Sequence, residues 1–130
     1  MHEPCGKRIL LADDDPLVRS MFSRILQRAG YEVVAVENGL QVLKAMRDAS
    51  EADRFDLLVL DIVMPEMEGL ETIKEMRASH PDLPILAISG AGAISEGQYL
   101  PIAAHMGAQR TLQKPVPNEV LLDTISELLT

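Results

Sequence analysis

The 130 residues, 47% of them hydrophobic and 25% charged, are enough for one well-packed core and exclude a disordered or low-complexity chain. No apolar run reaches the roughly 18 residues of a membrane span, and the N-terminus lacks the apolar stretch of a signal peptide. A single cysteine cannot close an intrachain disulfide, which suits a reducing compartment. We therefore expect a cytoplasmic protein. The net charge of −8 argues against nucleic-acid binding and favours proteins or cations as partners.

Apolar runs of strand length alternate along the chain with longer segments of helical period. The expected strands are 9–12, 33–36, 57–60, 85–88 and the weaker 110–113. The expected helices are approximately 16–30, 39–49, 67–79, 95–106 and 118–129. Pro16 and Gly30 suit the two ends of the first helix, and Asn38 and Asn118 are candidate N-terminal caps. This alternation predicts an α/β fold in which helices cover both faces of a parallel sheet, with the middle three or four strands buried on both faces.

The first helix has more apolar residues than packing against a core requires. They cover about half of its circumference, whereas a surface helix needs a stripe of about 100°. The set is Leu17, Val18, Met21, Phe22, Ile25, Leu26 and Ala29. Two interpretations stay open: Leu17 and Met21 pack over neighbouring loops, or they form an exposed edge at which another protein docks.

Polar residues gather where the expected strands end, which is the edge at which open parallel sheets bind ligands. They are Asp13, Asp14 and Asp15 after the first strand, Asp61 after the third, Ser89 after the fourth and Lys114 after the fifth. If Asp13, Asp14 and Asp61 converge, their charges repel, and a divalent cation relieves that repulsion. Oxygen ligands without cysteine or clustered histidine favour Mg²⁺. Taken alone, the aspartate triplet could equally be an acidic helix start, and Lys114 an ordinary surface lysine.

Together these residues predict a site for phosphoryl transfer. Asp61 is the expected nucleophile, Lys114 supplies a positive charge, and Ser89 supplies a hydroxyl donor. The loop that follows Asp61, residues 62–65, can bring a backbone carbonyl to the metal. The proline after Lys114 favours a cis peptide bond.

These motifs resemble the receiver domain of two-component response regulators over about residues 7–129. The resemblance rests on ILLADDDP at 9–16, DLLVLDIVMPEMEG at 56–69, ISG at 88–90, and Gly107-Ala108 leading to Lys114-Pro115. It implies a flavodoxin-like (βα)5 three-layer sandwich with a five-stranded parallel sheet of order 2-1-3-4-5. Residues 1–6 would then be a tail, and residues 7–130 the receiver domain.

The resemblance also implies a role for each site residue. Asp13 and Asp14 would be the acidic pair that binds Mg²⁺, with Asp61 and the backbone carbonyl of Val63 as further ligands. Asp61 would be the phosphorylated residue, Ser89 the switch hydroxyl and Lys114 the partner of the phosphate. The phosphoryl donor would be a sensor histidine kinase or a histidine phosphotransferase, and the recipient of the signal a downstream protein or an output domain. Such a protein catalyses only its own phosphorylation and dephosphorylation.

One position departs from the family pattern. Three residues before Lys114, where the family usually has a Tyr or Phe that swings inward on activation, this chain has Thr111. No aromatic residue of the expected fifth strand can replace it, and Tyr99, in the region of the fourth helix, is a weak candidate. We therefore expect a weaker coupling between the site and the fifth strand.

Two rival functions belong to other classes. A haloacid-dehalogenase-like phosphohydrolase could use Asp13 and Asp15 as its Asp-x-Asp motif, but such enzymes need a larger fold with a cap, and Asp61 is the better-isolated nucleophile. An interaction module that no longer responds to phosphate would have lost the acidic pair, Asp61 or Lys114, and all are present.

Overall fold

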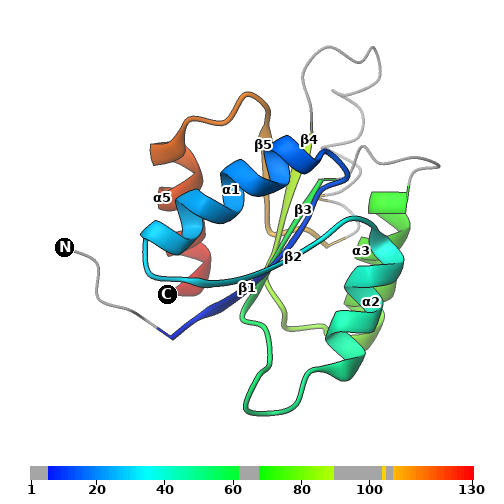
Figure 1. Ribbon diagram of the computed structural model, residues 1–130. Helices are drawn as coiled ribbons and strands as arrows, with labels where there is room; N and C mark the ends of the chain where they lie inside the picture. The colour runs from blue at the N-terminus through cyan, green and yellow to red at the C-terminus, as the bar shows by residue number, and fades with distance from the viewer. Residues whose placement is uncertain (1–5, 62–67, 90–103, 105–106) are drawn as a thin grey trace.

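Five parallel strands form one sheet in the computed structural model, which describes residues 6–61, 68–89, 104 and 107–130 (Figure 1). The strands are β1 (Arg8–Ala12), β2 (Glu32–Val36), β3 (Leu57–Asp61), β4 (Ile85–Ser89) and β5 (Arg110–Gln113). Their order in the sheet is β2-β1-β3-β4-β5, as expected. Strand β5 has its expected bounds, and each of the other strands is one residue longer at one end.

Burial follows the position of each strand in the sheet. Strands β3 and β4 are buried at every residue, and β1 is buried at all but its first, because helices cover both faces of these three central strands. Strand β2 has no buried residue although its sequence is as apolar as theirs. It is an edge strand of the sheet that the described residues form, with β1 as its neighbour.

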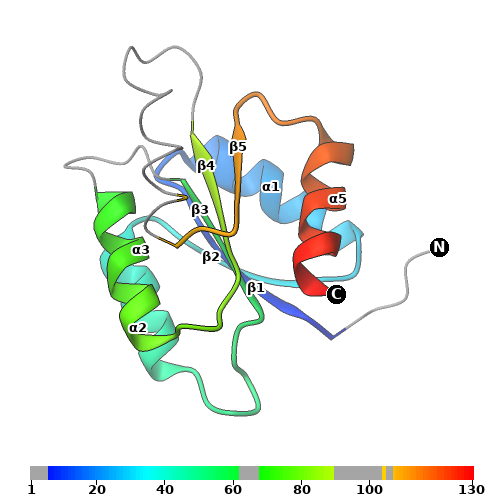
Figure 2. The ribbon, with the colours of Figure 1, turned by 180° about the vertical axis from the view of Figure 1, so that it is seen from behind.

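The helices cover the sheet in two pairs. The described helices are α1 (Pro16–Arg28), α2 (Gly39–Asp48), α3 (Glu68–Ser79) and α5 (Asn118–Leu129). Figures 1 and 2 show α1 and α5 on one face and α2 and α3 on the other. Alternate residues of β1 pack on opposite faces of the sheet. Ile9 belongs to the core under α1 and α5, and Leu10 belongs to the core under α2 and α3. None of the helices in the described ranges is long and apolar enough to cross a membrane.

Two of the described helices begin with a side-chain cap, and the one at Asn38 confirms the prediction. Asp15 caps α1 by accepting a hydrogen bond from the amide of Leu17 at 2.9 Å, and Asn38 caps α2 in the same way from Gln41 at 2.9 Å. Helix α1 ends at Arg28, two residues before Gly30.

The expected cap at Asn118 is wrong. Asn118 is the first residue of α5, and Pro117 occupies the cap position with an extended backbone. The cause is that the carbonyl of Pro117 already accepts the first helical hydrogen bond, from the amide of Leu121 at 3.0 Å, so α5 starts one residue earlier than the polar side chain suggests. The helix expected over 95–106 lies outside the described residues, apart from residue 104.

Candidate functional site

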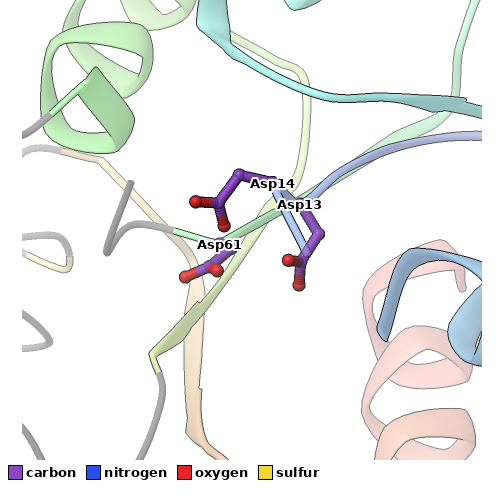
Figure 3. A group of neighbouring side chains, drawn as sticks. All are labelled: Asp13, Asp14 and Asp61. Atoms are coloured by element: carbon purple, nitrogen blue, oxygen red, sulfur yellow. The ribbon is translucent and has the colours of Figure 1, made fainter. Parts of the chain in front are cut away.

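Three carboxylates meet at the carboxyl edge of the sheet (Figure 3). Asp13 and Asp14 directly follow β1, Asp61 is the last residue of β3, and β1 and β3 are adjacent. One carboxylate oxygen from each residue lies within 4.8 Å of those of the other two. Asp13 and Asp61 are 2% and 6% exposed, whereas Asp14 is exposed. The convergence expected from the sequence is therefore present, and the three residues offer only oxygen ligands to a cation.

The three consecutive aspartates in the turn after β1 have different roles. The amide of Asp13 donates to the carbonyl of Val36 at 3.2 Å, which extends the contact between β1 and β2. One carboxylate oxygen of Asp13 accepts from the amide of Asp15 at 2.9 Å, and Asp15 in turn caps α1. Asp15 thus fits the interpretation of an acidic helix start, while Asp13 and Asp14 belong to the cluster.

Lys114 is paired with two of the three carboxylates. Its Nζ atom donates to Oδ2 of Asp13 at 3.0 Å and to Oδ2 of Asp61 at 3.4 Å. Its side chain is 19% exposed, so it is not an ordinary surface lysine. The peptide bond between Lys114 and Pro115 is cis, as the sequence predicts.

The surroundings of Lys114 keep it positively charged. Burial alone would lower the pKa of its ammonium group, but the hydrogen bond to Asp13 and the charges of Asp61 and Asp13 outweigh burial and raise that pKa above its usual value. The site therefore holds a fixed cation beside Asp61 at neutral pH.

Ser89 brings a hydroxyl to the same edge. It is the last residue of β4, the neighbour of β3, and it is fully buried. Within the described ranges, its Oγ atom has no hydrogen-bond partner. A buried hydroxyl without a partner costs about 1 to 3 kcal/mol, so Ser89 has a donor that a group arriving at this edge could use.

The remaining predicted residues divide into two groups. Val63 and Tyr99 lie outside the described residues. Thr111 is partly buried in β5 and is in register with Ala87 of β4.

Sequence reasoning missed one residue that contacts the cluster. Arg19 of α1 donates from Nη1 to the main-chain carbonyl of Asp13 at 2.9 Å. Every residue has a main-chain carbonyl, so the residue type does not show which carbonyl accepts a hydrogen bond. The only indication in the sequence is the position of Arg19, early in the helix that follows Asp13.

Comparison with known proteins agrees with this geometry. The family model for the response regulator receiver domain matches residues 9–126. The chain belongs to this receiver family. Among its relatives, response regulator MprA of Mycobacterium avium is 38% identical over 122 residues, which are 94% of this chain and 50% of that protein. The receiver domain thus spans about half the length of the curated relatives it matches.

Solved structures of receiver domains have the same fold. Chemotaxis response regulator CheY4 of Vibrio cholerae superposes with a TM-score of 0.80 and 32% identity, covering 95% of this chain and 99% of that one. TrrA of Thermotoga maritima, solved in complex with Mg²⁺ and BeF, gives a TM-score of 0.79 and 31% identity, covering 95% and 99%. The haloacid-dehalogenase alternative loses its support, because the family is that of receivers and because Asp15, which it needs, caps α1.

Proposed function

We propose that this receiver domain accepts a phosphoryl group on Asp61 from a sensor histidine kinase or a histidine phosphotransferase, and that the modified form changes the binding of a downstream protein or an output domain. The observation that carries the proposal is the position of Lys114, whose ammonium group bridges Asp13 and Asp61 within one cluster of three carboxylates. A structural ion pair needs one carboxylate. A cluster of three carboxylates with one ammonium group has excess negative charge, which a divalent metal ion would balance.

The proposed reaction is a nucleophilic displacement at phosphorus. A carboxylate oxygen of Asp61 forms the new P–O bond, the P–N bond to the donor imidazole breaks, and its electron pair stays on the imidazole nitrogen. Lys114 faces the negative charge on the transferred oxygens, and the Ser89 hydroxyl, which has no partner among the described residues, donates to one of them. Hydrolysis later returns Asp61 to its carboxylate form.

The residues at this edge fit Mg²⁺. Asp13, Asp14 and Asp61 supply hard oxygen ligands, and in our proposal the carbonyl of Val63 adds another. When bound, Mg²⁺ neutralises charge on the phosphoryl oxygens. Asp14 is the exposed member of the cluster and is therefore the ligand most accessible to a hydrated ion. The complex of TrrA with Mg²⁺ and BeF supports this assignment.

The exposed edge of α1 is the proposed dock for the phosphoryl donor. Leu17 and Met21 are 80% and 51% exposed, which favours an exposed edge over close packing against neighbouring loops. Met21 also lines a groove of about 420 Å³ that reaches Lys114 and Pro115. A protein bound on this edge would lie beside the phosphoryl-accepting cluster.

Mass spectrometry after treatment with acetyl phosphate tests the acceptor. We expect one phosphoryl group per wild-type chain, one on Asp123→Asn, which removes an exposed carboxylate from α5, and none on Asp61→Asn. An equal mass gain in Asp61→Asn and in the wild type would refute Asp61 as the acceptor. Release of many phosphates per chain from a generic ester would support a hydrolase instead.

A further inference from the structure

We propose that Arg19 is a positioning residue of the metal site, and that it acts by fixing the turn that aims Asp14. The inference rests on the proposed role of Asp13, Asp14 and Asp61 as Mg²⁺ ligands. Arg19 is partly buried in the first turns of α1 and donates from Nη1 to the carbonyl of Asp13 at 2.9 Å. Its own amide donates to the carbonyl of Asp15 at 2.9 Å, which anchors Arg19 to the far end of the same turn.

Asp14 depends on the main chain for its direction. The carboxylate of Asp13 is held from both sides, by the amide of Asp15 and by Lys114. Asp14 is exposed, and in the described part of the chain no hydrogen bond or ion pair holds its side chain. The backbone of the turn therefore sets the direction of its Cα–Cβ bond, and with it the positions that the carboxylate can reach.

Arg19 acts on the one peptide group that sets this direction. The carbonyl of Asp13 and the amide of Asp14 belong to the same planar peptide unit. That peptide plane includes the Cα atom of Asp14. The bond from Arg19 to the carbonyl therefore fixes the orientation of the plane and the position of this Cα atom. Partners of this kind, which hold metal ligands without touching the metal, typically change metal affinity by roughly 10- to 100-fold when they are removed.

The direction in which Mg²⁺ affinity changes when Arg19 is replaced tests the proposal, because the charge of Arg19 and its hydrogen bond act in opposite directions. A guanidinium group near a cation site repels the cation, so loss of the charge alone would tighten Mg²⁺ binding. Loss of a bond that positions Asp14 would weaken it. Because Arg19 is partly buried and its guanidinium group donates directly to the carbonyl of Asp13, we expect the positioning effect to exceed the charge effect.

Titration with Mg²⁺ alone, followed by nuclear magnetic resonance of the full chain, measures this effect. Arg19→Ala should raise the dissociation constant of Mg²⁺ by roughly tenfold, the lower end of the range for such partners, because loss of the guanidinium charge offsets part of the effect. Arg19→Lys keeps the charge and should recover part of the loss. Arg24→Ala removes the same charge from an exposed position of α1 and should stay within about twofold of the wild type.

Phosphorylation by acetyl phosphate at increasing Mg²⁺ gives a second measurement. Arg19→Ala should need more Mg²⁺ for its half-maximal rate and reach nearly the wild-type rate at saturation, since only metal binding is impaired. Unchanged or tighter Mg²⁺ binding by Arg19→Ala would overturn the inference, and if that variant does not fold, the comparison of Arg19→Lys with the wild type decides in the same way. Weaker Mg²⁺ binding with no phosphate on Asp61 would refute the proposed function and leave the role of Arg19 intact.

Discussion

The main-chain amide of Lys114 donates a hydrogen bond to the carbonyl of Ser89 at 2.7 Å. This bond joins the ends of β4 and β5 at the carboxyl edge of the sheet. The residue that carries the cation and the residue that carries the buried hydroxyl are thus tied to each other through their backbones. The bond therefore keeps the main chains of these two residues together at the edge where Asp61 lies.

Asp14→Asn should weaken Mg²⁺ binding more than any other single change among the three aspartates. We expect wild-type affinity in the millimolar to sub-millimolar range, because few protein ligands hold a water-rich Mg²⁺ site, and a loss of about tenfold in the variant. Asp15→Asn is the matched control: it removes the same charge from the next residue, and asparagine caps helices as well as aspartate does. Titration by nuclear magnetic resonance compares the two, and equal affinities for Asp14→Asn and wild type would rule out Asp14 as a ligand.

The strands and the carboxylate cluster were predictable from the sequence, for a physical reason. In a doubly covered parallel sheet the central strands are continuous apolar runs, and the first polar residue after each run marks the edge where ligands bind. The runs ending at Ala12 and Leu60 therefore located Asp13 and Asp61 without coordinates.

The features that the sequence did not predict depend on main-chain geometry. The cap position of α5 depends on the carbonyl of Pro117, and the exposure of β2 depends on its place in the sheet. Arg19 and Arg77 bond to main-chain carbonyls, which every residue has, so no residue type marks their partners. The roles of Asp61, Ser89 and Lys114 in phosphoryl transfer stay predictions.

Lys114→Ala should still be phosphorylated to some extent, but its conformation should respond little to the phosphoryl group. The variant loses a fixed cation beside Asp13 and Asp61, so we expect slow, weak phosphorylation and little conformational change once phosphate is attached. Lys44→Ala, which removes an exposed lysine of α2, should behave like the wild type. Backbone amide shifts before and after phosphorylation measure the response. A full set of shifts in phosphorylated Lys114→Ala would contradict the role given to its ammonium group.

Arg77 should contribute to stability far more than a typical surface arginine. Its guanidinium group donates to the carbonyls of Pro81 and Gly107, both at 2.7 Å, and of Leu83 at 2.9 Å, and so joins α3 to the segments that enter β4 and β5. We expect Arg77→Ala to lower the free energy of unfolding by about 2 kcal/mol, because these three carbonyls and that of His80, at 3.1 Å, lose a charged donor.

Urea denaturation of three variants checks this expectation. Arg47→Ala removes an exposed arginine of α2 and should change the free energy of unfolding by less than about 0.5 kcal/mol. Gly107→Ala should destabilise by at least about 1 kcal/mol, because Gly107 has a φ of 128° and an added Cβ atom would lie 2.7 Å from Nε of Arg77. Equal stability of Arg77→Ala and Arg47→Ala would show that the network around Arg77 is not a stabilising one.

Strand β5 is held at both ends. At its start, the residue before it, Gln109, donates its amide to the carbonyl of Ile85 at 3.0 Å, and its side-chain oxygen accepts from the amide of Ile85 at 2.7 Å. At its end, the amide of Lys114 bonds to Ser89. Thr111, between these two anchors, has no ring that could swing inward, so the usual source of movement in this strand is missing.

Activation should therefore change strand β5 little. A phosphoryl group shifts a two-state equilibrium only by the difference in its interactions with the two states, and without a packed aromatic ring one source of that difference is absent. We expect a beryllofluoride phosphate mimic to alter hydrogen exchange chiefly from Gly90 to about Met106, a segment outside the described residues apart from residue 104. The amides of Arg110–Gln113 should stay within about threefold of their rates without the mimic. Asp61→Asn with the same mimic is the control and should show no change in either segment. Exchange rates of the amides around Thr111 could instead change as much as those of Gly90–Met106 in the wild type. Strand β5 would then take part in the switch without an aromatic ring, and the argument from Thr111 would be wrong.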